Sequence, residues 1–181
     1  HNKYFEYGVQ FLDNYLRHFN GNFLFIDGDE IQRNRVPEMG QLYLAELPFL
    51  ILGFYFLLRK KPHNWQFVFW WLAIAPMASA LTFQSPHEIR AMNMIVQLTI
   101  ISGYGLWNVW GLRIISKPIV SLFHCFIVLI FAWNFSFYLH QYYVHYSKTY
   151  PAAWEYGFRD LTLYIKENQN RFEKIYLTNK Y

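Results

Sequence analysis

Four long apolar runs alternate with short polar segments along this chain. The runs cover residues 40–58, 65–83, 91–112 and 118–139, and their carboxylate or basic positions are Glu46, near one end of the first run, and His124 in the fourth. A helix that crosses a bilayer needs about 20 mostly apolar residues. The pattern therefore predicts a mostly α, multispanning membrane protein with about four transmembrane helices.

The short connections between the runs predict how the helices are oriented. Lys and Arg in short loops are held on the cytoplasmic side of a membrane. The connections after the first and third runs carry Arg59, Lys60, Lys61, Arg113 and Lys117 and no acidic residue. The connection 84–90 holds one Arg and one Glu, so we expect it outside, together with both ends of the chain. Much of the basic excess behind the formal net charge of +4 lies in the cytoplasmic connections. Membrane topology and anionic lipid explain it better than a nucleic-acid partner does.

The segments before and after the runs complete the predicted organisation. We expect an external loop at 1–39, a transmembrane region at 40–140 and the start of an external soluble domain at 141–181. Apolar residues recur at helical spacing at Phe5, Tyr7, Phe11, Leu12, Tyr15 and Leu16. They predict a helix that lies along the membrane surface. Turn residues flank the apolar run 23–26, which predicts a short strand or an inserted wedge.

The last 30 residues predict one helix and one strand. Trp154, Phe158, Leu161 and Ile165 form a helical stripe, and 174–178 has a composition typical of a strand. About 30 residues are too few to fold alone. We therefore expect an α/β domain that begins here and is cut off. The start at His1 rather than Met likewise indicates a piece of a longer protein.

The sequence offers little for metal or redox chemistry. A single Cys125 permits no internal disulfide, and its mid-run position favours a packing role. Of the seven histidines, His124 alone lies clearly inside a run, so no facing pair is available to hold haem iron. The sequence predicts no metal site and no cofactor.

The external turn 85–90 is the strongest constellation of polar residues. Arg90 comes at the headgroup level, beside a helix N-terminus that favours anions. There its guanidinium suits a lipid phosphate, although an interfacial anchor is an alternative interpretation. His87 and Glu88 are further candidates in the same turn.

Two other places hold candidate side chains. Arg33 and Arg35 precede the first run, where they are possible external-loop contacts or, alternatively, members of a salt-bridged loop with nearby acidic residues. Glu46 is an expensive carboxylate inside the first run, followed by Pro48. It fits a substrate contact and a structural role equally well.

Four segments carry a family resemblance. They are 22–29 (NFLFIDGD), 33–49 (RNRVPEMGQLYLAELPF), 85–90 (SPHEIR) and 154–157 (WEYG). Together they resemble bacterial members of the dolichyl-phosphate-mannose protein mannosyltransferase family, glycosyltransferase family 39, which have the GT-C fold. The resemblance implies a plasma-membrane enzyme that passes a sugar from a polyprenyl-phosphate donor to a protein or glycan acceptor at the outer face.

The resemblance also assigns roles to residues. It implies that Arg90, with His87 beside it, contacts the lipid phosphate, although the Arg-Tyr-x-x-Pro pattern of many relatives is replaced here by Arg90 followed by Ala91 and Met92. Family members carry their proposed catalytic acid in an early external loop, which this chain does not contain. We therefore expect a C-terminal part of the enzyme and assign no catalytic residue.

Two other function classes stay open. A transporter also has several spans, and Gly103 and Gly105 with Gln97 and Thr99 indicate either a small-residue packing face or a loosened helix. A noncatalytic membrane scaffold or lipid-binding subunit is the second alternative.

Overall fold

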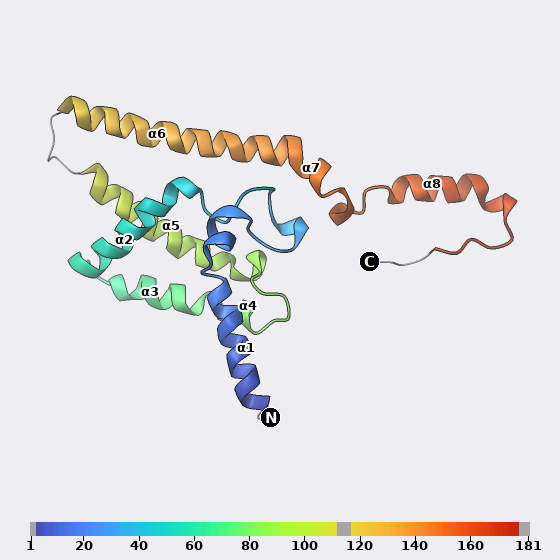
Figure 1. The fold of residues 1–181 in the computed structure, drawn as a ribbon, viewed down its shortest axis with the longest axis horizontal. Helices are drawn as coiled ribbons and strands as arrows, with labels where there is room; N and C mark the ends of the chain where they lie inside the picture. The colour runs from blue at the N-terminus through green and yellow to red at the C-terminus, as the bar shows by residue number, and fades with distance from the viewer. Residues whose placement is uncertain (1–2, 112–116, 178–181) are drawn as a thin grey trace.

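The computed structural model describes residues 3–111 and 117–177, and it is mostly α, with no strand among them. The longer helices are α1 (Lys3–Arg17), α2 (Leu47–Lys60), α3 (Trp65–Ile74), α5 (Glu88–Trp110), α6 (Lys117–His140) and α8 (Phe158–Asn168), and short helical turns cover Asn22–Ile26, Gln32–Asn34, Leu44–Glu46, α4 (Met77–Ala80), Gln141–His145, α7 (Tyr146–Thr149), Pro151–Trp154 and Gln169–Arg171. Helices α2, α3 and α5 form a body with α6 along one side, α1 leaves this body, and α8 lies beyond the end of α6 (Figure 1).

The closest packing in the body is the crossing of α2 and α5. A Cβ atom on Gly53 would overlap the carbonyl oxygen of Ile101, and one on Gly105 would overlap the carbonyl oxygen of Phe49. The two backbones can therefore approach only because these positions lack side chains. Around this crossing lie the buried core residues Phe23, Leu24, Leu42, Leu50, Leu57, Leu72, Met94, Leu98 and Ile101.

The loop before α2 belongs to the same core. The run predicted as a strand or wedge forms a π-helical turn, Asn22–Ile26, so the strand alternative is wrong. Phe23 and Leu24 of this turn are buried, and the Leu42 N–H donates to the carbonyl oxygen of Leu24 at 2.8 Å. The run inserts into the protein core because burial of its apolar side chains is favourable, and hydrogen bonds such as that from the Asp27 N–H to the Asn22 carbonyl oxygen at 2.8 Å satisfy its backbone groups.

The helices agree with the third and fourth apolar runs and are shorter than the first two. α5 and α6 have 23 and 24 residues, about 34 and 36 Å at 1.5 Å per residue. α2 and α3 have 14 and 10 residues, or about 21 and 15 Å, less than a hydrocarbon core of about 30 Å. Pro48 lies in the first turn of α2, and Pro76 follows the end of α3. Proline is favoured in the first turn of a helix and breaks it further in, because it lacks the N–H and clashes with the preceding turn, so Pro48 marks the start of α2 and Pro76 the end of α3.

One helical run of the described chain, Pro118–Thr149, is long and apolar enough to cross a membrane. Only 6% of its most apolar window is buried, so its sides are open rather than packed in a core. The structure thus shows a mostly α chain with one such helix.

The helix ends lie at two opposite ends of the body. α2 ends and α3 begins at the same end at which α5 ends and α6 begins (Figure 1). Arg59 and Lys60 are the basic residues in the last turn of α2 at this end, and Lys60 hydrogen-bonds Asn108 near the end of α5. Arg113, which also served the orientation prediction, lies outside the described residues. The start of α5 and the end of α6 lie at the opposite end.

The C-terminal segment differs from its prediction. The expected helical stripe is interrupted, because Glu155 and Gly157 take left-handed backbone angles between Trp154 and the start of α8 at Phe158. Residues 174–177 form no strand, and Thr178 lies outside the described residues. A strand needs a partner for its backbone hydrogen bonds, and the described part of the chain offers none. The predicted α/β character is therefore wrong for 141–177, which is helical and irregular.

We expect the Gly105→Ala and Gly53→Ala variants to lower the free energy of unfolding by about 1–3 kcal/mol, since the added methyl group forces α2 and α5 apart. Thermal unfolding in detergent measures this loss. Gly103→Ala is the matched control, because nothing lies within 4 Å of a Cβ at that position of α5. Equal stability of the Gly103 and Gly105 variants would contradict the close crossing.

Candidate functional site

Asp29 fastens the first turn of α5 to the loop that precedes α2. Its side chain is fully buried. The carboxylate accepts hydrogen bonds from the Ile31 N–H at 2.9 Å, the Asn34 side-chain amide at 2.8 Å and the Glu88 N–H at 2.9 Å. The N–H groups of a first helical turn have no partner within the helix and favour negative charge. The carboxylate therefore fixes Glu88 against the Gln32–Asn34 turn.

His18 forms a second joint beside Asp29. Its Nδ1 lies 2.9 Å from the carbonyl oxygen of Asn14, so Nδ1 carries the hydrogen and donates it. Nε2 then accepts from the Ser79 hydroxyl at 2.8 Å and from the His87 N–H at 3.3 Å. Burial lowers the pKa of His18, against smaller opposing effects of its backbone contacts and of Asp29. A neutral His18 therefore links α1 to the segment that leads into α5.

His87, a predicted phosphate contact, points into this buried cluster. His87 is 7% exposed, and its Nδ1 lies 3.7 Å from an Asp29 carboxylate oxygen and has no hydrogen-bond partner among the described residues. The structure thus surrounds His87 with Asp29 and His18 rather than with solvent.

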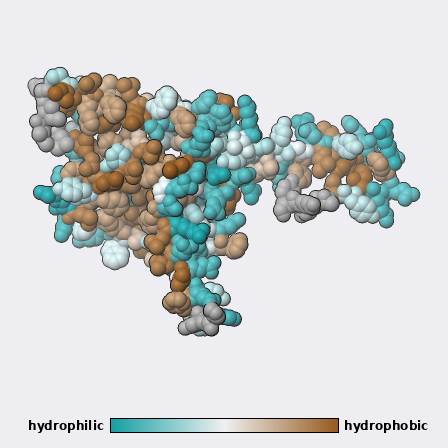
Figure 2. Space-filling model, in the orientation of Figure 1, coloured by the Kyte–Doolittle hydropathy of each residue, from teal (hydrophilic) through white to brown (hydrophobic). Residues whose placement is uncertain are grey.

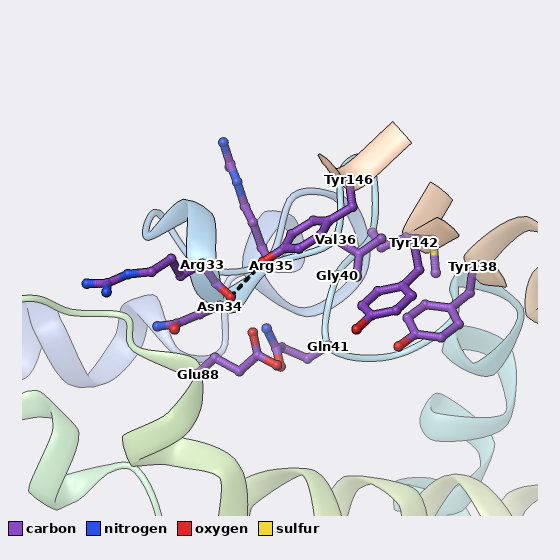
Figure 3. A pocket seen from close by; sticks show the side chains of 11 residues that line it. Arg33, Asn34, Arg35, Val36, Gly40, Gln41, Glu88, Tyr138, Tyr142 and Tyr146 are labelled. Carbon is purple, nitrogen blue, oxygen red and sulfur yellow. Dashed lines mark hydrogen bonds between the residues drawn. The ribbon is translucent and has the colours of Figure 1, made fainter. Parts of the chain in front are cut away.

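A polar pocket of about 300 Å³ opens where the loop before α2 meets the end of α6. It is lined by Arg33, Asn34, Arg35, Val36, Met39, Gly40, Gln41, Glu88, Tyr138, Tyr142 and Tyr146. Figure 3 shows the side chains of Glu88 and Gln41 facing each other, with the hydroxyl groups of Tyr138 and Tyr142 directed toward them. A carboxyl, an amide and two phenols together offer donors and acceptors to the hydroxyl groups of a ligand.

Glu88 is the acidic group of this pocket. The half-buried position raises the pKa of its carboxyl, and the negative charge of Asp29 adds to the rise. A hydrogen bond with Gln41 opposes it. The carboxyl is therefore easier to protonate than an exposed glutamate, and in that form it donates a hydrogen bond.

The side chains of Arg33 and Arg35 border the pocket but point away from the Glu88–Gln41 pair (Figure 3). Arg33 lines it through its backbone, and its carbonyl oxygen accepts from the Tyr146 hydroxyl at 3.0 Å. The guanidinium of Arg35 lies 5.2 Å from the ring centre of Tyr150, and its buried Nε has no hydrogen-bond partner among the described residues.

The alternative interpretation, a salt-bridged loop, is not supported by any ion pair in the described part of the chain. Neither Arg33 nor Arg35 forms an ion pair there with the acidic residues of 27–30.

The remaining predicted residues lie elsewhere. Arg90 is exposed and donates to the Thr82 hydroxyl at 2.8 Å. It follows Glu88 by two residues, and such residues point to different sides of a helix. Glu46 accepts from the Tyr43 N–H at 3.3 Å and hydrogen-bonds Ser102 of α5, so it stabilises its own turn and the α5 contact.

An apolar groove of about 550 Å³ lies next to the polar pocket. Its walls come from α2, α5, α6 and the turn before α2: Leu44, Ala45, Pro48, Phe49, Leu52, Val109, Phe123, Phe126, Ile127, Ile130, Trp133, Asn134 and Phe137. The polar pocket continues along the same segments: Asn134 of the groove and Tyr138 of the pocket lie four residues apart on one face of α6, and Gln41 of the pocket precedes Leu44 of the groove. A long apolar cavity thus adjoins a polar one.

Sequence reasoning missed most of this site. It singled out Glu88, Arg33 and Arg35 but not Gln41 or the tyrosines. The tyrosines at 138, 142 and 146 recur every four residues, a spacing that places them on one helix face, and this was the available signal.

No family model, curated protein or solved structure matches this chain. The resemblance to the mannosyltransferase family therefore stays a prediction.

We expect Asp29→Asn to lower the free energy of unfolding by about 1–3 kcal/mol. The substitution replaces one carboxylate oxygen with an NH₂ group, so the N–H groups that donated to that oxygen lose their acceptor. Thermal unfolding in detergent is the measurement. Asp27→Asn, which removes an exposed carboxylate two residues away, is the control and should change little. If both variants unfold alike, Asp29 does not hold α5 in place.

Acid should destabilise the protein through His18. Because burial lowers the pKa of His18 in the folded state, the unfolded chain takes up the proton first, and stability falls as the pH drops below about 6.5. Melting temperatures between pH 8 and pH 5 test this. The His18→Gln variant should lose part of the slope, whereas His63→Gln, at an exposed position, should keep it. An unchanged slope in His18→Gln would refute the assignment.

Proposed function

We propose that this chain forms part of a membrane glycosyltransferase that binds a polyprenyl-phosphate-linked sugar and passes the sugar to a protein or glycan acceptor at the outer face of the membrane. The observation that supports this most is the apolar groove adjoining the polar pocket. An amphiphile with a long hydrocarbon tail and a hydroxyl-rich head matches this pair of cavities.

The groove fits the tail of such a molecule. Asn134 is the one polar residue among its lining residues, and aromatic and branched side chains from three helices form its walls. An isoprenoid chain gains packing contacts there that a flat helix surface does not give. Its lining residues on α6 run from Phe123 to Phe137, about 21 Å of helix, as a linear tail requires.

The pocket fits the sugar. Hydroxyl groups need partners that both donate and accept, and Glu88, Gln41, Tyr138 and Tyr142 provide them within one cavity.

Multispanning membrane insertion is part of the proposal. The open apolar sides of α6 support it, and so does the gathering of the α2 and α5 ends, with Arg59 and Lys60, at one end of the body. The short helices α2 and α3 then lie within the bundle without crossing the bilayer alone. The polar pocket, at the other end, faces outward.

A noncatalytic lipid-binding subunit is the second candidate, since the same groove suits any long-chain lipid. The polar pocket discriminates between the two. A transferase part binds the polyprenyl-phosphate sugar more tightly than polyprenyl phosphate without a sugar. A general lipid-binding subunit gives equal affinities.

Binding of a polyprenyl-phosphate hexose to the chain in nanodiscs tests the proposal. We expect Leu52→Trp, which fills the groove, to raise the dissociation constant at least about tenfold, a loss of about 1.4 kcal/mol. Leu58→Trp is the matched control, because Leu58 is an exposed residue of the same helix outside the groove. Glu88→Gln should weaken binding of the hexose-bearing lipid and leave binding of plain polyprenyl phosphate unchanged.

Two results would contradict the proposal. Equal affinity of the wild type for lipids with and without the hexose would favour the lipid-binding subunit. Unchanged binding in Leu52→Trp, relative to Leu58→Trp, would show that the groove does not hold the tail.

A further inference from the structure

Helix α1 has three faces with different surroundings. One face packs on the body: Asn14 donates to the carbonyl oxygen of Ala80 at 3.1 Å, and the Tyr15 hydroxyl donates to that of Ala73 at 2.9 Å. A second face is polar and exposed, with Gln10, and with Asp13 paired to Arg17 at 2.8 Å. The third face is apolar and exposed.

The exposed apolar face is a continuous stripe. Phe5, Val9, Leu12 and Leu16 are 72%, 53%, 55% and 56% exposed. They follow one another at spacings of four and three residues, which places them on one side of the helix. Phe11 and Tyr15, which the sequence groups with them, are half-buried toward the protein. The stripe is thus what remains of the apolar side after α1 has packed on the body.

The direction of α1 determines which side of the molecule the stripe faces. α1 leaves the body sideways, across the direction of α5 and α6, at the end where α5 begins and α6 ends (Figure 1). Figure 2 shows hydrophobic side chains along the edge of this arm that faces α2 and α3, and hydrophilic ones along the edge toward α8. The apolar edge therefore faces the same side as the apolar runs of the body.

We propose that α1 is an interfacial helix that inserts the stripe of Phe5, Val9, Leu12 and Leu16 into the outer surface of the bilayer. The inference rests on the membrane insertion included in the proposed function, and not on sugar transfer. Amphipathic helices of this kind lie in the interface plane with the apolar side among the acyl chains.

The balanced charges of α1 are compatible with binding to an uncharged lipid surface. Its acidic residues Glu6 and Asp13 balance Lys3 and Arg17. Attraction to anionic headgroups therefore contributes little, and burial of apolar surface is the driving force. Anchored on the body through Asn14 and Tyr15, the helix sets the depth at which the segment after it, with the polar pocket, meets the membrane surface.

Site-specific labels test the insertion. In a Cys125→Ser background, an environment-sensitive fluorophore is attached at Leu12→Cys, at Gln10→Cys as the matched polar-face control, or at Leu129→Cys on the exposed side of α6. The proteins are placed in phosphatidylcholine nanodiscs. Quenching is measured with aqueous iodide and with a nitroxide on the acyl chain of the lipid.

We expect iodide quenching to be several-fold weaker at residue 12 than at residue 10, and nitroxide quenching to be stronger at residue 12. Iodide quenching as strong at residue 12 as at residue 10 would overturn the inference. Protection of residue 12 from both quenchers would overturn it too, since another protein surface then covers the stripe. Nitroxide quenching at Leu129 without quenching at Leu12 would refute the interfacial helix alone, whereas none at either would refute the membrane insertion as well.

Discussion

The buried Asp29 carboxylate determines how the loop before α2 and the start of α5 meet. A charge removed from water is costly unless hydrogen bonds compensate for it, and Asp29 has three N–H donors at 2.8–2.9 Å. One donor is the first backbone N–H of α5, so the carboxylate also meets the positive end of that helix. Glu88 is held in the polar pocket as a consequence, and His18 and His87 pack directly against the same carboxylate.

The close crossing of α2 and α5 determines the other half of the site. Gly53 and Gly105 let the two backbones touch, and the resulting pair forms one wall of the apolar groove while α6 forms the other. A larger residue at either glycine would separate the helices and change the width of the groove. The groove and the polar pocket thus depend on two unlike contacts, one of apolar packing and one of hydrogen bonding, that share α5.

Several elements follow from local sequence alone. The 3.6-residue spacing of apolar positions predicts α1, and long uninterrupted apolar runs predict α5 and α6 within a few residues. The same reasoning overextended the first two runs, because it gave apolarity more weight than Pro48 and Pro76. It also offered a strand as one of two alternatives for 23–26 and assigned one to 174–178, where composition favours a strand but no neighbouring strand is present among the described residues.

The candidate residues show the limit of reasoning along the chain. Arg90, His87 and Glu88 are neighbours in sequence. In the structure Arg90 is exposed to solvent, His87 lies in the buried cluster with Asp29 and His18, and Glu88 lines the pocket. Successive residues of a helix point in different directions, so adjacency in the chain does not make a site. Gln41, Glu88 and Tyr138 line one pocket although long stretches of chain separate them.

The sequence by itself determined which segments are helical and apolar, because helix length and side-chain period are local properties. Only the tertiary structure decided that Asp29 binds the start of α5, that Tyr138 joins Glu88 in one pocket, and that the stripe of Phe5, Val9, Leu12 and Leu16 on α1 stays exposed. Those outcomes depend on how distant segments pack, and no periodicity within a single segment carries that information.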